Sequence, residues 1–394
     1  SIDSELRSMT PRMDQLRSEQ KAAGKQMGKL SPEEREQLLA KMATVKEELK
    51  AAEGREKELR ADLEVQLSLI PNLPDQEVPD GADDQENEEV GKWGELPEFD
   101  FTPRAHYEIG EAQGWLDFVR ASELAGSRNY LLFGDLVQLH DAVLRYAIDH
   151  MVGKGFVPVD PPLLVRDEAM FGTGFFPGGE EQTYRCEKDG LNLIGTSEVP
   201  VTSLHKGEIL PVADLPKRYV ARSACFRREA GTYGKDTRGL YRVHQFHKVE
   251  QVVIDVADSA RSMEHHQAIV KNATDCLEAF GLPHRIVAVC GGDLGVPQAF
   301  KYDIECWMPS REAYGETHSA SRFYDYQARR LQLRYRDEGG KVLFCHTLNN
   351  TVIASPRILI PLLEVHQQQD GTVKLPAALV PYMGGREVIG EAVF

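Results

Sequence analysis

The chain has 394 residues, of which 41 % are hydrophobic, so it is long enough for two or three domains with at least one large core. Its formal net charge of −16 argues against a protein that simply coats nucleic acid, although a local basic stripe could still bind one. The six cysteines lie far apart without a Cys-x-x-Cys pair, and no signal peptide or bilayer-length apolar run is present. We therefore expect a reduced, cytoplasmic protein with no membrane partner.

Residues 1–74 predict an antiparallel coiled-coil hairpin. Apolar residues step alternately by four and three from Ile2 to Leu30, and a second series of this kind runs from Leu38 to Leu63. The sequence Ser31-Pro32 between them is a good N-cap followed by a good first helical residue. Each helix would reach about 45 Å. Pro11 predicts a kink in the first helix, or a helix that starts at Thr10–Pro11.

A basic stripe lies near the tip of this expected arm. Four cations follow one another at every fourth residue and so share one helical face: Arg17, Lys21, Lys25 and Lys29. No acid occurs between Glu19 and Glu33. The stripe could contact the phosphates of a nucleic acid. It could also be a solvated flank, which is the commoner case in an arbitrary coiled coil.

Residues 75–100 are expected to form an acidic linker, because they are rich in Pro, Gly and acid and too polar to bury, with Trp93 as an anchor at the end. Residues 101–394 predict an α+β domain, an antiparallel sheet flanked by helices. The strand-like segments there are mostly consecutive or hairpin-linked rather than each followed by a crossover helix. Neither G-x-G-x-x-G nor G-x-x-x-x-G-K-[ST] occurs, so the usual nucleotide sites of parallel sheets have no support.

The stretch Phe226–Glu250 predicts a hairpin with charge on both legs. Residues two apart in a strand share a face, so Arg227 and Glu229 point the same way, as do Phe246 and Glu250 on the return leg. That surface offers a fork for a phosphate or carboxylate, an aromatic plate and two carboxylates, which suits a nucleotide. The alternative is an exposed ion-pair ladder, and charge alone does not separate the two. The loop between the legs could close over a polyanion with Gly231, Gly234, Lys235, Arg238 and Gly239.

Two further features favour the nucleotide. Glu316 and Ser319 are a carboxylate and a hydroxyl suited to Mg²⁺ beside phosphates. Ser355 and Pro356 are expected to be the N-cap and first residue of a helix, with Arg357 in its first turn. An arginine at a helix N-terminus favours a terminal phosphate, although a capped helix with an arginine is more often just a helix.

In combination these residues resemble the class II aminoacyl-tRNA synthetases, and specifically the bacterial-type seryl-tRNA synthetases. The sequence "KGFVPVDPPLLV" is similar to motif 1, "FRRE" through "HQFHKVE" to motif 2, and "LNNTVIASPR" to motif 3. The resemblance covers nearly the whole chain and includes "GTSEV", "QARRLQLRYR" and "LVPYMGG". Members usually begin with a further short helical segment, so we expect an N-terminally shortened arm. Glycines common in motif 3 are replaced, and Pro361 predicts a kink in the next helix.

The resemblance implies ATP-dependent ligation of L-serine to serine tRNA through a seryl-adenylate, with Mg²⁺, in a homodimer, and serylation of selenocysteine tRNA where present. It implies a catalytic role for Arg227, Glu229 and Arg357. The implied ATP contacts are Arg227, Arg228, Glu229, Val243, Phe246, Glu316, Thr317, His318, Ser319 and Arg357, with Mg²⁺ on Glu316 and Ser319. The implied serine contacts are Thr196, Glu198, Arg227, Glu250, Asn349 and Thr351. The stripe Arg17, Lys21, Lys25 and Lys29 would bind tRNA.

Two other functions stay open at this level. One is a synthetase-like ligase that charges a carrier protein, although such an enzyme has little use for a long basic-tipped arm. The other is a dimeric scaffold with an inactive synthetase domain, against which the retained charges of Arg227, Glu229, Glu316 and Arg357 argue.

Overall fold

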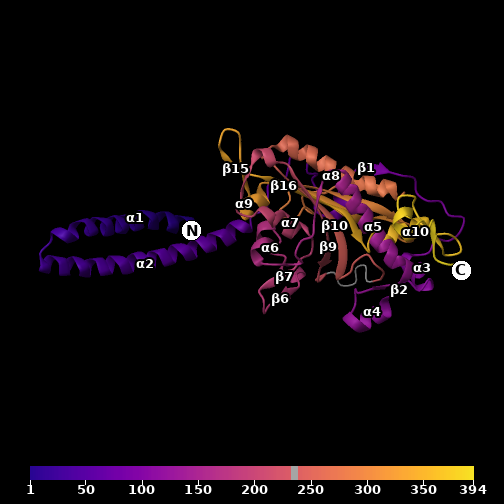
Figure 1. The fold of residues 1–394 in the computed structure, drawn as a ribbon, viewed down its shortest axis with the longest axis horizontal. Coiled ribbons are helices and arrows are strands. Elements are labelled where there is room, and N and C mark those ends of the chain that lie inside the picture. The colour runs from indigo at the N-terminus through magenta and orange to yellow at the C-terminus, as the bar shows by residue number, and fades with distance from the viewer. Residues whose placement is uncertain (232–237) are drawn as a thin grey trace. The chain divides into compact units, whose positions relative to one another are not determined.

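The computed structural model describes residues 1–231 and 238–394, which form two compact units, Ser1–Pro71 and Asn72–Phe394. The first unit is the predicted hairpin of two helices, α1 (Ile2–Gln26) and α2 (Pro32–Ser68), joined through a short 3₁₀ turn (Figure 1). Ser31 caps α2 as predicted, and Glu34 completes a capping box. Met13 and Leu16 of α1 are buried against Val45 and Leu49 of α2, so the heptad seam holds the hairpin together.

Helix α1 runs through Pro11 without a break, so the predicted start at Thr10–Pro11 is wrong. A proline inside a helix removes one N–H donor. Leu6 and Met13, on either side of Pro11, are buried in the hairpin seam. The stabilisation from this packing outweighs the loss of one helical hydrogen bond, so the segment stays helical. The Thr10 hydroxyl also donates to the carbonyl of Leu6, at 3.0 Å.

The second unit is built on an eight-stranded sheet in the order β1-β11-β12-β13-β16-β10-β9-β4. Neighbouring strands are antiparallel except β4 and β9, which confirms the predicted antiparallel sheet. The strands are β1 (Glu88–Trp93), β4 (Val157–Val159), β9 (Lys217–Phe226), β10 (Gln245–Asp255), β11 (His284–Ala288), β12 (Phe300–Met308), β13 (Ala313–Tyr324) and β16 (His346–Ser355).

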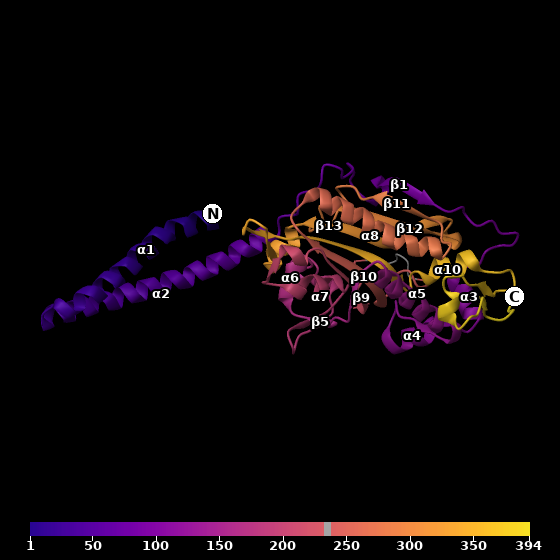
Figure 2. The same cartoon turned by 45° about the horizontal axis from the view of Figure 1, so that its top comes forward.

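Two long helices, α5 (Gly134–Gly153) and α8 (Ser259–Ala279), pack on this sheet (Figure 2). Their apolar residues, such as Leu144 and Leu277, join strand residues such as Val253 in the main core. The shorter helices are α3 (His106–Ala112), α4 (Phe118–Ala125), α6 (Asp167–Thr173), α7 (Glu198–Thr202), α9 (Tyr326–Leu331) and α10 (Leu359–His366).

Small sheets complete the unit. They pair β2 (Leu116–Asp117) with β3 (Leu131–Leu132), β5 (Leu164–Val165) and β6 (Arg185–Cys186) with β7 (Leu191–Leu193), β8 (Ile209–Pro211) and β15 (Val342–Phe344) with β14 (Arg334–Arg336), and β17 (Val373–Lys374) with β18 (Val388–Ile389). In the described parts of the chain, no helix combines the length and apolarity needed to cross a membrane.

The stretch predicted as an acidic linker differs in the structure, because part of it belongs to the sheet. Strand β1 pairs with β11 along one edge, from Glu88 opposite Ala288 to Trp93 opposite His284. An edge strand needs main-chain hydrogen bonds rather than apolar burial, and β1 keeps most of its side chains exposed. The Trp93 ring stacks on the His284 ring with centroids 5.5 Å apart, so the expected anchor is present.

The expected cap of the last helix is also wrong. Strand β16 continues through Ser355, and α10 begins at Leu359. The Ser355 hydroxyl is bonded to the His140 ring at 2.8 Å, rather than to a helix N–H group. Pro361 lies in the first turn of α10, where a missing N–H removes no intrahelical bond, so the reason for a kink disappears.

Candidate active site

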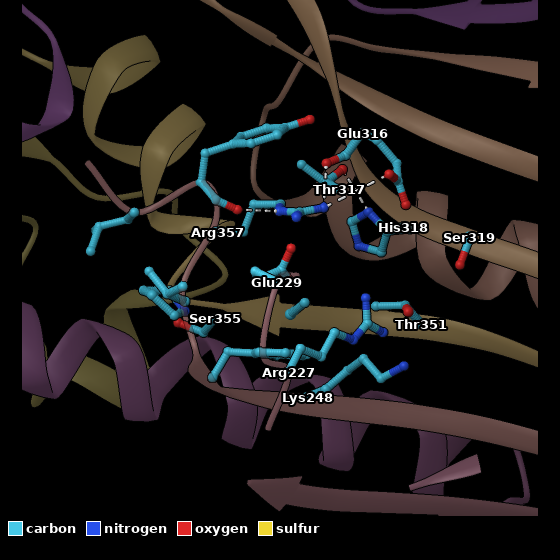
Figure 3. Close-up of a pocket in the computed structure, with 16 residues that line it drawn as sticks. Arg227, Glu229, Lys248, Glu316, Thr317, His318, Ser319, Thr351, Ser355 and Arg357 are labelled. Atoms are coloured by element: carbon cyan, nitrogen blue, oxygen red, sulfur yellow. Dashed lines mark hydrogen bonds and ion pairs between the residues drawn. The ribbon is translucent and has the colours of Figure 1, made fainter. Parts of the chain in front are cut away.

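One pocket of about 590 Å³ opens on the large sheet, between the legs of the charged hairpin and the ends of β13 and β16. The residues that line it in Figure 3 come from these elements. Most of the predicted ATP contacts are among them: Arg227, Glu229, Val243, Phe246, Glu316, Thr317, His318, Ser319 and Arg357. Thr351, predicted for serine, also lines the pocket.

The β9–β10 register positions Arg227. Phe226 pairs with Gln245, and Arg227 continues the hairpin with its N–H donated to the carbonyl of His244, at 2.9 Å. Its guanidinium carbon lies 5.3 Å from the Phe246 ring centroid, and its Nε donates to the carbonyl of Gly195, at 3.3 Å. The fork and the aromatic plate inferred from the sequence therefore lie against each other.

Glu229 is held in an unusual conformation. Its φ of 52° is in the left-handed region, which costs a non-glycine residue backbone strain. Its carboxylate forms an ion pair with Arg242, at 3.0 Å. Glu229 is thus fixed at the wall of the pocket beside an arginine that the sequence analysis did not assign.

Arg357 is fixed by main-chain carbonyls at another wall. Its Nε donates to Tyr241 and its Nη1 to Glu316, both at 3.0 Å (Figure 3). The guanidinium carbon also lies 4.4 Å from the centre of the Tyr241 ring. These contacts leave a fixed positive charge beside the Glu316 carboxylate, whose Oε2 is 3.9 Å from Nη1.

Glu316 and Ser319 fit a Mg²⁺ ion bound together with phosphates. Both line the pocket from β13, and Mg²⁺ commonly takes one or two protein oxygens and leaves its other positions to water and phosphate. Burial raises the pKa of Glu316, but Lys301, Arg357 and Arg227 outweigh burial and lower the pKa, so the carboxylate is ionised. Within residues 1–231 and 238–394, no group of three or more His, Cys, Asp or Glu could hold a metal by itself.

The side chains of His318 and Thr317 form hydrogen bonds within the sheet. The His318 ring bonds to the Val352 carbonyl at 2.9 Å and to the Thr317 hydroxyl at 2.7 Å. Burial lowers the pKa of His318 to about 3, so the ring is neutral at physiological pH. Their contact with ATP stays a prediction.

Five predicted residues do not line the pocket: Thr196, Glu198, Arg228, Glu250 and Asn349. The main-chain N–H of Arg228 donates to Gln182, at 2.9 Å. Glu250 is 2 % exposed and lies on β10, paired with the pocket-lining Thr351 of β16, whose hydroxyl donates to its Oε2 at 3.4 Å.

Lys248 is the functional candidate that sequence reasoning missed. Its Nζ lies 2.5 Å from Oε2 of Glu250, and it also lines the pocket. Burial and the neighbouring Glu250 raise the pKa of Glu198 to about 7, while Lys248 acts in the opposite direction. Burial also raises the pKa of Glu250. The signal was available, because Lys248 stands between Phe246 and Glu250 on the same strand face.

The basic stripe of the arm stays a prediction as a surface for tRNA. Lys21 and Lys25 are exposed, but Arg17 is bound to Glu53 at 3.2 Å, so part of its charge is already neutralised. The side chain of Lys29 lies outside the described residues. So do Gly234 and Lys235 of the predicted polyanion-binding loop.

The antiparallel sheet, with arginines that follow β9 and β16 and an aromatic plate on β10, is the catalytic core of class II aminoacyl-tRNA synthetases. A family model described as tRNA synthetase class II core domain (G, H, P, S and T) matches residues 184–366. The model of the seryl-tRNA synthetase N-terminal domain matches residues 1–74.

The similar proteins narrow the class to one family. A serine–tRNA ligase of Deinococcus radiodurans is 49 % identical, over 99 % of this chain and 92 % of that protein. One of Thermotoga neapolitana is 46 % identical, over 97 % and 91 %. A seryl-tRNA synthetase from Pyrococcus horikoshii, solved as a complex with ATP, has a TM-score of 0.89 at 38 % identity, over 99 % and 92 %. The chain belongs to the seryl-tRNA synthetase family.

Proposed function

We propose that this chain activates L-serine with ATP and transfers it to serine tRNA. The observation that carries the proposal is that one pocket brings together Arg227, Phe246, Glu316 and Arg357. Phe246 offers a plate for adenine, Arg227 a fork for the α-phosphate and the serine carboxylate, and Arg357 a charge for the γ-phosphate. The ATP bound in the Pyrococcus horikoshii relative supports this use of the pocket.

In the first step the serine carboxylate attacks the α-phosphorus, and pyrophosphate leaves. Arg227 orients the carboxylate and stabilises charge on the α-phosphate, because its guanidinium is held between Phe246 and the Gly195 carbonyl. Arg357 stabilises the departing charge. Glu316 and Ser319 would hold Mg²⁺, which neutralises phosphate charge when bound. Glu229, which is paired with Arg242, borders the adenine together with Val243.

In the second step a ribose hydroxyl at the 3′ end of tRNA attacks the adenylate carbonyl, and AMP leaves. Neither step needs a nucleophile from the protein. Positioning and charge neutralisation supply the acceleration.

Selection of serine falls to a group of buried polar residues at and next to the pocket. Thr196 and Glu198 would receive the amino group, and Glu250, Asn349 and Thr351 the hydroxyl. A site built to bond a hydroxyl rejects an analogue without one by about 10⁴-fold or more, because its buried polar groups lose their partner. Alanine would be excluded in this way, and threonine by its extra methyl group.

The proposal includes a homodimer, tRNA binding by the arm, and cytoplasmic location. Strand β4 forms one edge of the large sheet, and its residue Val157 is 56 % exposed. An exposed apolar residue on a sheet edge is suited to bury against a second copy of the chain. The exposed cations Lys21 and Lys25 would contact the backbone of serine tRNA. Recognition through shape and backbone would extend to selenocysteine tRNA where it exists.

Serine-dependent exchange of pyrophosphate into ATP tests the activation step. The intact chain should exchange label with serine and much less with alanine or threonine. Arg227→Ala should lose most of this activity and keep the fold, since the Arg227 side chain is exposed at the pocket. Exchange that is independent of serine, or unchanged in Arg227→Ala, would contradict the proposal.

A further inference from the structure

Glu364 on α10 is a fully buried carboxylate that joins two distant segments. Its Oε1 accepts the main-chain N–H of His106 at 3.0 Å, the His106 Nδ1–H at 2.8 Å and the Ser310 hydroxyl at 2.9 Å. Its Oε2 accepts the Ser310 N–H, at 2.9 Å. Burial raises the pKa of Glu364, but the bonds from His106 outweigh burial and lower it, so the carboxylate is ionised. A buried charge with this many donors fixes the groups that surround it.

His106 extends this connection to the motif 2 hairpin. Because its Nδ1 donates to Glu364, its Nε2 is the acceptor of the neutral ring, and it receives the Leu240 N–H at 3.1 Å. The neighbouring Gly239 has a φ of 82°, and a Cβ there would lie 2.3 Å from Nε2. The chain can approach the ring this closely only with glycine. Glu364 thus holds Ser310 directly and Leu240 through His106.

The two segments carry Arg311 and Tyr241, each the next residue along the chain. The Arg311 guanidinium carbon lies 4.2 Å from the Tyr241 ring centre, and that of Arg357 lies 4.4 Å from the same centre. Tyr241 and Arg357 both line the pocket, so the contact with this ring brings the positive charge of Arg311 next to the pocket wall, where it would attract a polyanion. Tyr241 also accepts from Arg357 through its carbonyl, so one residue contacts both cations.

We propose that Glu364 and His106 are positioning residues that set Arg311 beside Arg357, and that Arg311 is a second guanidinium for the β- and γ-phosphates of ATP. The inference rests on the proposed function, because it takes ATP as the occupant of the pocket. Glu364 and His106 touch no reacting atom. Their effect reaches the substrate through Tyr241 and Arg311.

Binding of ATP and AMP to the full chain, without serine, separates this role from general loosening of the fold. AMP has the adenine and the α-phosphate but lacks the two phosphates assigned to Arg311. Arg311→Ala should weaken ATP about five- to tenfold and AMP less than twofold, as expected for one charge-assisted contact. Arg311→Lys should recover part of the ATP affinity. The matched control is Arg336→Ala, which removes a different exposed arginine, on β14.

Glu364→Gln tests the buried connection. The glutamine NH₂ group would replace the Oε2 atom that accepts the Ser310 N–H, so the Ser310 segment would lose this acceptor and face another donor instead. ATP affinity should fall as in Arg311→Ala, and in the exchange assay the KM for pyrophosphate should rise while the KM for serine stays within twofold. Equal weakening of ATP and AMP in Arg311→Ala, or unchanged ATP affinity, would overturn the inference. Failure of the unaltered chain to bind ATP would instead overturn the proposed function.

Discussion

Lys248→Met should lower the free energy of unfolding, because Lys248 compensates the buried carboxylates of Glu250 and Glu198. The variant keeps the apolar stem but removes the cation that lies 2.5 Å from Glu250, whose side chain is 2 % exposed. Loss of one partner of a buried pair costs about 3–5 kcal/mol, because the other charge stays buried without compensation. We expect a loss of about this size in the free energy of unfolding at pH 8.

The loss should shrink at lower pH. The pKa of Glu198 is raised to about 7 and that of Glu250 is also raised, chiefly by burial. A carboxyl whose pKa is higher in the folded state contributes stability that is present below its unfolded pKa and is lost as pH rises through the folded pKa. Without Lys248 these values rise further. Between pH 8 and pH 6 the carboxyls therefore take up protons and the difference between variant and parent narrows.

Urea unfolding followed by tryptophan fluorescence measures this difference. All three tryptophans, Trp93, Trp115 and Trp307, lie in the unit Asn72–Phe394, so the arm does not contribute. Lys206→Met, at an exposed lysine, is the control and should change stability by less than about 0.5 kcal/mol. A destabilisation below about 1 kcal/mol at pH 8, or the same destabilisation at both pH values, would show that Lys248 does not compensate the buried carboxylates.

Other substitutions test the remaining parts of the account. Glu316→Gln should keep the fold but raise the Mg²⁺ concentration needed for exchange; an unchanged Mg²⁺ titration would place the metal elsewhere. Gly239→Ala should lower the unfolding midpoint and weaken the binding of ATP, because a Cβ would clash with His106 and the φ of Gly239 is positive. Unchanged stability would disprove the close contact between Gly239 and His106. Neutralising Lys21 and Lys25 together should leave exchange normal, weaken the apparent tRNA affinity and flatten its salt dependence; equal damage to exchange and charging would indicate a structural role.

The charged hairpin was predictable because its pattern is local. Alternation along β10 places Phe246, Lys248 and Glu250 on one face, as predicted. Arg227 and Glu229 lie beyond the end of β9 at Phe226, and Glu229 has a left-handed φ of 52°, so the pocket brings them to Phe246 by a turn and not by strand alternation. The spacing of Glu316 and Ser319 was equally local. Ser31-Pro32 likewise fixes the start of α2 without any tertiary contact.

Features that depend on distant residues were missed. The His106–Glu364 bond joins residues 258 positions apart, and no local pattern signals it. Strand β1 forms because β11 offers a free edge, although its own composition is that of a linker. Ser355 has the composition of a helix cap, but its partner is His140 on α5, so the strand continues instead. Lys248 was visible, but its role depends on the burial of Glu250 and Glu198 around it.

Charging of tRNA with serine distinguishes the proposed ligase from the two other functions that the sequence left open. The intact chain is incubated with labelled serine, ATP and unfractionated bacterial tRNA, and label that precipitates with the tRNA is counted. We predict label that requires ATP, is abolished when the 3′-terminal ribose is oxidised beforehand, and is absent with labelled alanine or threonine. Serine-dependent pyrophosphate exchange without any label on tRNA would contradict the account and favour a ligase that charges another carrier.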